Sequence, residues 1–337
     1  MHKLVALHNT AHDVRSAETL RKLSYACRLR ARALIDSEHS LAFEFSMADL
    51  LYRVHQVRTE FHHKMLDKQS KALKYLSEAD FIQHLFFCHS VRALPTATQA
   101  AVPIFIENVI KDLLIDEVAL ICFACYKCQY SLPKPEHWTM LIEAFQNHKG
   151  PLSDISMTVF AKYFRYQKTT NHVETQILRK FLDAAESRQQ DWTIATHIRV
   201  ANAGTQSGQF NEAIVTGAMR KMMKELGNCR VKDISMCLYS YAFFDLKLSP
   251  SDAGAIIEEL NKSECHVFHV WFIRAVLSLA LLGYYDESLL IKSFKIDLID
   301  VRTTHLNSRF DLHALWTVCN IKFPNLVAEK KVSAHVK

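Results

Sequence analysis

Apolar residues recur at helical spacing along most of this chain, in runs separated by short polar or proline-containing stretches. Residues 117–126 read EVALICFACY and residues 154–163 read DISMTVFAKY, so an acidic residue opens each run. A carboxylate suits the positive end of a helix dipole, and the residues that follow it are largely apolar. Prolines such as Pro151 and Pro250 fall between the runs, where connections are expected. The pattern predicts helices joined by short connections.

The helical pattern repeats at nearly constant intervals. The acidic residues that open the runs follow one another in steps of 37, 37, 37 and 42 residues: Asp80, Glu117, Asp154, Asp191 and Asp233. The letters DISM at 154–157 return at 233–236. Such periods are typical of stacked helical hairpins, because a single hairpin cannot bury its apolar face alone. We therefore predict an all-α fold, a right-handed α-solenoid of stacked helical hairpins with a period of about 37–42 residues.

Four regions are expected along the chain. Residues 1–75 fit the period poorly and hold 13 Lys or Arg against 8 Asp or Glu, so they are predicted to form a basic helical N-terminal cap. Helical repeats are predicted for residues 76–231 and, as a second group, for residues 232–325. Residues 326–337 are predicted to form a C-terminal tail.

Composition narrows the fold class further. With 7 Gly and 7 Pro among 337 residues, the chain is poor in the residues that tight turns consume, which argues against sandwiches, barrels and Rossmann enzymes. The nine cysteines are odd in number and lie mostly inside apolar runs, so we expect them to be reduced. The apolar run at 275–285 is too short to cross a bilayer, and no membrane insertion is expected.

The sequence was searched for residues that could carry out catalysis or bind a cofactor. Cys122, Cys125 and Cys128 have a spacing that can hold an iron–sulfur cluster, but they fall within a predicted helix, where free Cys packs like a small hydrophobe. The chain has no H-E-x-x-H zinc motif, no phosphate-binding glycine loop and no Gly-x-Ser-x-Gly elbow. We expect no catalytic residues, metal or cofactor; an enzyme that uses a metal at the Cys122 cluster is the alternative.

Basic residues are distributed in a way that suggests a polyanionic ligand. The net charge is +6, and residues 216–232 alone carry five Lys or Arg against one Glu. Lys162 and Arg199 stand at the same distance behind their acids, and Arg165 lies one turn beyond Lys162. Stacked helices would align such cations into a stripe, where phosphates are neutralised and tyrosine rings stack on the bases of a single strand. The predicted RNA-binding residues are Lys127, Lys162, Arg165, Arg199, Arg220, Lys221, Lys224, Tyr163 and Tyr166.

Two segments resemble a known family. Residues 232–243, KDISMCLYSYAF, and residues 271–289, WFIRAVLSLALLGYYDESL, resemble the helical repeats of the FAST-kinase-domain family, and Leu312–Pro324 is similar to its closing helix. The resemblance implies a non-catalytic RNA-binding protein of the mitochondrial matrix that acts on transcript stability, processing or translation. Its implied partners are single-stranded mitochondrial transcripts and other RNA-processing proteins. The family usually ends in a RAP domain, and only the short segment 325–337 follows Pro324, so that module is expected to be missing here.

Alternatives to this assignment remain open. Helical repeats form surfaces that suit peptides as well as RNA, so a protein-interaction scaffold without RNA binding is the second hypothesis. The N-terminus carries five arginines before residue 35, as in an organelle transit segment and equally in an ordinary basic helix. The cytoplasm is therefore the alternative location.

Overall fold

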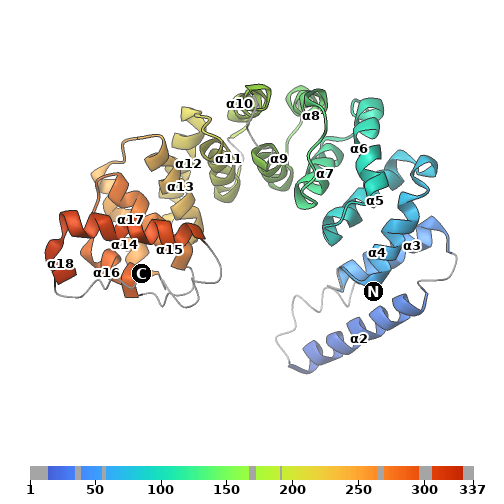
Figure 1. Ribbon diagram of the computed structural model, residues 1–337, viewed down its shortest axis with the longest axis horizontal. Coiled ribbons are helices and arrows are strands. Elements are labelled where there is room, and N and C mark those ends of the chain that lie inside the picture. The colour runs from blue at the N-terminus through green and yellow to red at the C-terminus, as the bar shows by residue number, and fades with distance from the viewer. Residues whose placement is uncertain are drawn as a thin grey trace. The chain divides into compact units, whose positions relative to one another are not determined.

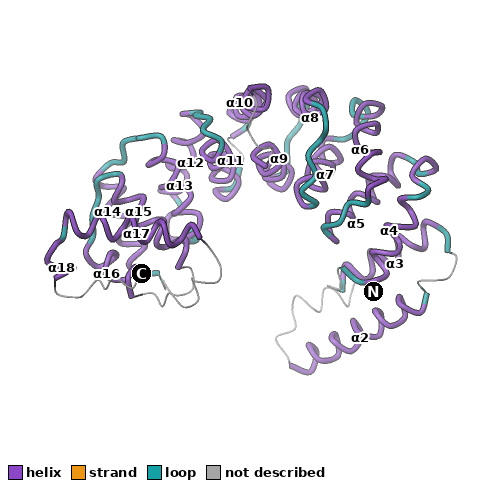
Figure 2. Tube along the Cα trace, in the orientation of Figure 1, coloured by secondary structure: helices purple, strands orange, loops and turns teal. Residues whose placement is uncertain are grey.

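The computed structural model describes residues 14–34, 39–54, 58–166, 172–189, 192–263, 269–295 and 306–328. Within these ranges all regular structure is helical and no strand occurs, as Figure 2 shows. Consecutive helices pack against their neighbours, so the prediction of an all-α solenoid is confirmed. Asp191, residues 1–13 and most of the predicted tail lie outside the described residues. No helix in the described ranges is both long enough and apolar enough to span a membrane.

The chain divides into two compact units, Met1–Leu152 and Ser153–Lys337. The sequence predicted boundaries at 75/76, 231/232 and 325/326. The structure places no division at 231/232, because the helix Val231–Phe243 packs against helices on both sides of it. A helix that is covered on two sides belongs to the middle of a stack.

The first unit contains the predicted cap and two hairpins. Its elements are α2 (Val14–Ala33), α3 (Leu41–Arg53), α4 (Glu60–Ser70), η1 (Leu73–Tyr75), α5 (Glu78–Val91), α6 (Thr96–Val109), α7 (Ile115–Lys127) and α8 (Pro135–Asn147). Helix α5 packs against α7, and α6 packs against α8, so equivalent helices of the two hairpins lie side by side (Figure 1). Residues 1–75 are helical for the most part where they are described.

The second unit is a longer stack of the same kind. Its elements are α9 (Asp154–Tyr166), α10 (His172–Glu186), α11 (Ile194–Gln206), α12 (Glu212–Lys224), η3 (Leu226–Asn228), α13 (Val231–Phe243), α14 (Pro250–Lys262), α15 (His269–Leu281), α16 (Glu287–Lys295), α17 (Leu306–Lys322) and α18 (Pro324–Ala328). Helices α9, α11, α13, α15 and α17 pack in that order and are called the first layer; α10, α12, α14 and α16 are called the second layer. First-layer helices begin at positions 154, 194, 231, 269 and 306, so successive starts are separated by nearly equal steps.

The two layers differ in burial. Helix α13 is covered on both flanks, and its buried residues include small polar ones such as Ser235 and Ser240. The Thr205 hydroxyl donates to Ser240 Oγ over 2.7 Å, which satisfies both hydroxyl groups between α11 and α13. The second-layer helix α14 buries Ala253, Ile256 and Leu260 along one stripe only. The strongly apolar runs of the sequence are therefore the first-layer helices.

Five helices of the repeats are each followed by a residue with a left-handed backbone conformation. Positive φ angles of 53° to 87° occur just after α5, α7, α11, α13 and α15, at Arg92, Gln129, Gly208, Asp245 and Gly283. The next backbone N–H bonds back to the last turn of the helix, for example from Leu246 to the Tyr241 carbonyl over 3.0 Å. This is a Schellman ending, for which glycine is the usual residue. Within each unit it recurs at close to one repeat step and is an independent sign of the repeat.

Replacing glycine by alanine at two sites should have opposite effects on stability. Gly283 has a φ of +87°, whereas Gly254 lies inside α14, and a Cβ would meet no atom within 4 Å at either position. Gly283→Ala should lower the free energy of unfolding by about 1 kcal/mol through backbone strain, and Gly254→Ala should raise it by about 1 kcal/mol through helix propensity. Urea denaturation of both variants measures the two effects, and changes of the same sign would contradict the assigned left-handed ending.

Candidate nucleic-acid interface

The cysteine cluster of α7 is part of the packed interior. Cys122 and Cys125 are buried, and Cys128, at the end of the helix, donates its thiol to the Cys88 carbonyl over 3.4 Å. Burial raises the thiol pKa values, that of Cys128 to about 11, so these thiols stay protonated at neutral pH. Among the described residues, no group of three or more His, Cys, Asp or Glu is arranged to hold a metal ion. The arrangement favours hydrophobic packing over a metal site.

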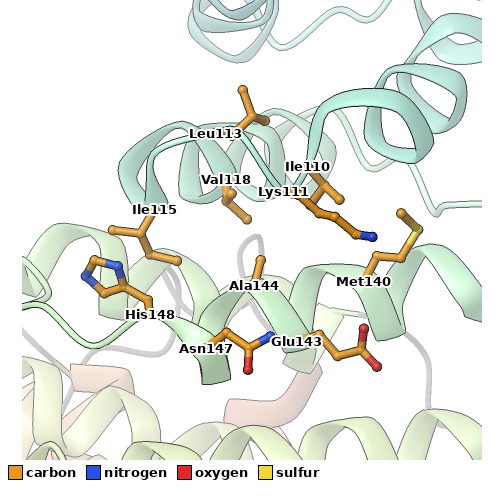
Figure 3. A pocket seen from close by; sticks show the side chains of 10 residues that line it. All are labelled: Ile110, Lys111, Leu113, Ile115, Val118, Met140, Glu143, Ala144, Asn147 and His148. Carbon is orange, nitrogen blue, oxygen red and sulfur yellow. The ribbon is translucent and has the colours of Figure 1, made fainter.

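A pocket of about 410 Å³ lies in the first unit beside α7 and α8 (Figure 3). Its walls are mostly aliphatic, with Ile115, Val118 and Met140 among the lining residues. The polar lining residues are Lys111, Glu143, Asn147 and His148, and Figure 3 shows Glu143 and Asn147 next to each other, with Lys111 and His148 toward opposite ends of the pocket.

Four basic side chains come together on the first layer of the second unit. They are Arg165 from α9, Arg199 from α11, and Arg230 and Lys232 from the start of α13, and we call them the cationic cluster. Burial lowers the pKa of Lys232, and so do the positive charges of Arg230, Arg199 and Arg165. The Arg199 guanidinium also donates to the Thr158 hydroxyl over 3.4 Å, which holds it across the α9–α11 contact.

One acidic residue balances part of this charge. Arg230 makes a two-pronged ion pair with the buried carboxylate of Asp233, with Nε–Oδ2 and Nη2–Oδ1 distances of 2.7 and 2.9 Å. Such fork geometry fixes the Arg230 guanidinium and neutralises it. Arg165, Arg199 and Lys232 take part in no ion pair within the described ranges. The cationic cluster therefore carries an excess of positive charge.

Aromatic rings extend the cationic cluster toward α15 and α17. The Lys232 ammonium lies 4.8 Å from the centroid of the Trp271 ring. The Arg274 guanidinium lies 5.8 Å from the Trp271 ring and 5.7 Å from the Tyr239 ring, and its Nε donates to Asp311 over 3.0 Å. Trp271 and Tyr239 are both partly exposed. Cations from α9, α11, α13 and α15 thus lie near the rings of Tyr239 and Trp271, and Asp311 of α17 pairs with Arg274.

The predicted cations lie at different positions along their helices. Arg165 and Arg199 both lie near enough to Lys232 to lower its pKa. The cations do not, however, occupy one repeated helix position, because Lys162 is the ninth residue of α9, Arg199 the sixth of α11 and Lys232 the second of α13. Each successive first-layer helix therefore carries its cation on a different turn. The equal distances from Asp154 and Asp191 did not measure the true register, since α9 begins at Asp154 itself and α11 only at Ile194.

One predicted base-stacking residue is wrong. Tyr163 is 0% exposed and its ring packs edge-on against Phe164, with centroids 5.5 Å apart, so it belongs to the core and cannot meet a ligand. Lys162 and Tyr166 are partly exposed on α9. Residues three apart on a helix differ in direction by about 60°, which is enough to bury Tyr163 and leave Tyr166 at the surface.

The remaining predicted cations lie elsewhere. Arg220, Lys221 and Lys224 are on α12 of the second layer, and the Lys221 ammonium donates to the Trp192 carbonyl. Lys221 thus holds α12 to the start of α11, while Arg220 and Lys224 are exposed. Lys127 belongs to the first unit, where Arg92 and Arg58 are the nearby cations that lower its pKa in addition to burial. The predicted cations therefore fall into three groups, on the first layer of the second unit, on α12 and in the first unit.

Sequence reasoning missed the contribution of α13 and α15. Lys232 and Trp271 are separated by close to one repeat step, so comparing the starts of successive repeats would have paired them. No protein-family model matches the chain. A comparison with curated proteins finds no match either. Function is therefore inferred from the chemistry of the surface and from the sequence resemblance alone.

Proposed function

We propose that this chain is a helical-repeat protein that binds single-stranded RNA on the first-layer surface of its second unit. The observation that supports this most is the convergence of Arg165, Arg199 and Lys232, from three different helices, beside the partly exposed ring of Trp271. Cations held close together repel one another, and bound phosphates relieve that repulsion. Exposed rings next to them offer faces on which unpaired bases stack.

The family resemblance gives the proposal its cellular context. The two resembling segments correspond to α13 and α15, and they supply Lys232, Tyr239, Trp271 and Arg274 to the surface. We therefore extend the proposal to mitochondrial RNA metabolism, with transcripts of the matrix as ligands and transcript stability, processing or translation as the process served. The role is binding, since the chemistry assembled on this surface is that of phosphate neutralisation and stacking rather than of proton transfer.

Salt-dependent binding tests the proposal. The full chain should bind a fluorescently labelled, unstructured RNA of about 20 nucleotides, with a log–log slope of affinity against salt of about −2 or steeper, as three or more phosphate contacts require. Fluorescence anisotropy from low to moderate salt measures this slope. A duplex of the same sequence should bind more weakly because its bases are already paired and stacked. Absence of binding at low salt would overturn the proposal, and binding of an acidic peptide in its place would favour the scaffold hypothesis.

A further inference from the structure

Four aromatic rings follow one another across three helices of the first unit. Tyr52 at the end of α3 meets Phe86 of α5 edge-on, with ring centroids 5.2 Å apart. Phe86 meets His89 at 5.0 Å, and His89 meets Phe123 of α7 at 4.7 Å. We call Tyr52, Phe86, His89 and Phe123 the ring ladder. Its contacts tie α3, α5 and α7 together along a single line.

The ring ladder lies at the border between the core and the surface. Tyr52 is 37% exposed, and Phe86, His89 and Phe123 are partly exposed. Phe87, the residue after Phe86, is fully buried, so α5 sends one phenylalanine into the core and presents its neighbour outside it. A core needs only the inward ring. Two of the ring contacts are edge-on, with interplanar angles of 70° and 72°, and a ring that keeps one part in solvent offers a surface on which a base of a single strand can stack.

Three cations border the ring ladder. The Lys127 ammonium lies 5.3 Å from the centroid of the Phe123 ring, and Arg92 and Arg58 are close enough to Lys127 to lower its pKa in addition to burial. In the parts of the chain that the structure describes, none of the three takes part in an ion pair. This group has the same chemistry as the cationic cluster of the second unit but consists of different residues.

The backbone conformation is strained at two of these cations. Arg58 and Arg92 both adopt left-handed φ angles, 61° and 60°. Arg92 occupies the helix-end position that the second unit fills with Gly208 and Gly283. Glycine takes this conformation without strain, whereas a side chain does not. Gln129 and Asp245 hold the same position after α7 and α13, so the ending does not require glycine, and the effect of the arginine is to place a guanidinium near Lys127.

His89 acts in the ring ladder as a neutral ring. Burial lowers its pKa to about 4, and the nearby charge of Lys127 contributes in the same direction. At neutral pH its imidazole is therefore uncharged and flat. It continues the row between Phe86 and Phe123 without adding a further charge.

We propose that the ring ladder and the cations Arg58, Arg92 and Lys127 form a second contact surface for single-stranded RNA, located in the first unit. Bases stack on the rings while the phosphates that join them lie against the three cations. Ring faces accept every base, so binding here tolerates different sequences. This inference rests on the proposed function, and it adds a stacking site in a region that the sequence marked only through Lys127 and the basic cap.

Substitution of the rings tests this inference in the full chain. Phe86→Leu combined with Phe123→Leu keeps apolar bulk and removes two stacking faces, so affinity for a single-stranded RNA of about 20 nucleotides should fall about tenfold or more. The slope of affinity against salt should not change, because no phosphate contact is lost. The fluorescence of RNA that contains 2-aminopurine should be quenched by the parent protein and less so by the double variant.

Arg92→Gln should instead make the slope of affinity against salt shallower by about 0.7, because one phosphate contact is lost.

Tyr75→Leu is the matched control. Tyr75 is 77% exposed with Lys74 4.8 Å from its ring, but it lies on η1 and makes no contact with the ring ladder among the contacts described. It should leave affinity and quenching unchanged. If the parent binds RNA and the double variant binds and quenches equally well, the inference that the ring ladder binds RNA is overturned, while the proposed function stands. If the parent binds no RNA at low salt, the proposed function itself fails. Circular dichroism checks that each variant is folded.

Discussion

Binding of single-stranded RNA should weaken about a thousandfold at moderate salt when the three cationic-cluster charges that lack an acid partner are reversed. The variant that tests this carries Arg165→Glu, Arg199→Glu and Lys232→Glu. Each substitution removes a phosphate contact and puts a repelling carboxylate in its place. The salt slope should become shallower by about 2 at the same time, because three phosphate contacts are lost. The fold should tolerate the change, since these three side chains are at least partly exposed and repel one another in the parent protein. Anisotropy titrations at several salt concentrations measure both effects.

A control with the same change in net charge separates position from total charge. Lys180, Arg220 and Lys224 are exposed cations on α10 and α12 of the second layer. Their triple replacement by glutamate should weaken binding far less, roughly tenfold, because only long-range attraction is lost. If both triple variants lose affinity equally, RNA is held by net charge and not by the cationic cluster. The same comparison decides whether the predicted residues Arg220 and Lys224 take part.

The stacking of hairpins was predictable because it depends on a periodic apolar pattern, and that pattern is long enough to be visible in one sequence. The exact residue at which each helix of a repeat begins was not predictable. Asp80, Glu117 and Asp233 are third residues of their helices, but Asp154 is the first residue of α9. An acid is favourable anywhere in the first turn of a helix, so it marks a helix start only to within a few residues. The shared left-handed ending was invisible too, because Arg92, Gln129 and Asp245 stand where glycine would have marked it.

The candidate site was predictable where a local pattern determines it and not where neighbouring helices determine it. Lys162 and Arg199 stood out as cations at repeat spacing, and Arg165 as a cation one turn beyond Lys162. Lys232 and Trp271 join them through the packing of α13 against α11 and α15, which brings Lys232 near Arg199 and over the Trp271 ring. Tyr163 shows the opposite failure, since composition suggested a stacking ring and helix rotation buried it.

Mild acid should destabilise the fold through histidines that are buried uncharged. His84 is fully buried between α4, α5 and α6, where Nδ1 lies 2.9 Å from Gln69 Oε1 and Nε2 lies 3.0 Å from the Thr98 hydroxyl. The Gln69 oxygen can only accept, so Nδ1 carries the proton and Nε2 accepts from Thr98. Burial lowers the pKa of His84 to about 4. His197 of α11 is similar, with its pKa lowered to about 4 by burial and by the charge of Lys221.

The sign of the pH effect follows from these values. A histidine whose pKa is about 6.5 when unfolded and about 4 when folded takes up protons preferentially in the unfolded chain below pH 6.5. The stability is therefore complete above pH 6.5 and is lost progressively as the pH falls toward 4. Between pH 7 and pH 5, His84 alone should lower the free energy of unfolding by about 2 kcal/mol.

His84→Gln separates this proton effect from packing. An amide can donate to Gln69 and accept from Thr98 as the neutral imidazole does, but it does not titrate. The variant should be less stable than the parent at pH 7, because glutamine fills the ring's space imperfectly, and it should lose about 2 kcal/mol less between pH 7 and pH 5. Urea denaturation at pH 7, 6 and 5 measures both quantities. A variant that loses as much stability as the parent would show that His84 is charged in the folded chain, and the two hydrogen bonds assigned to its neutral form would then be wrong.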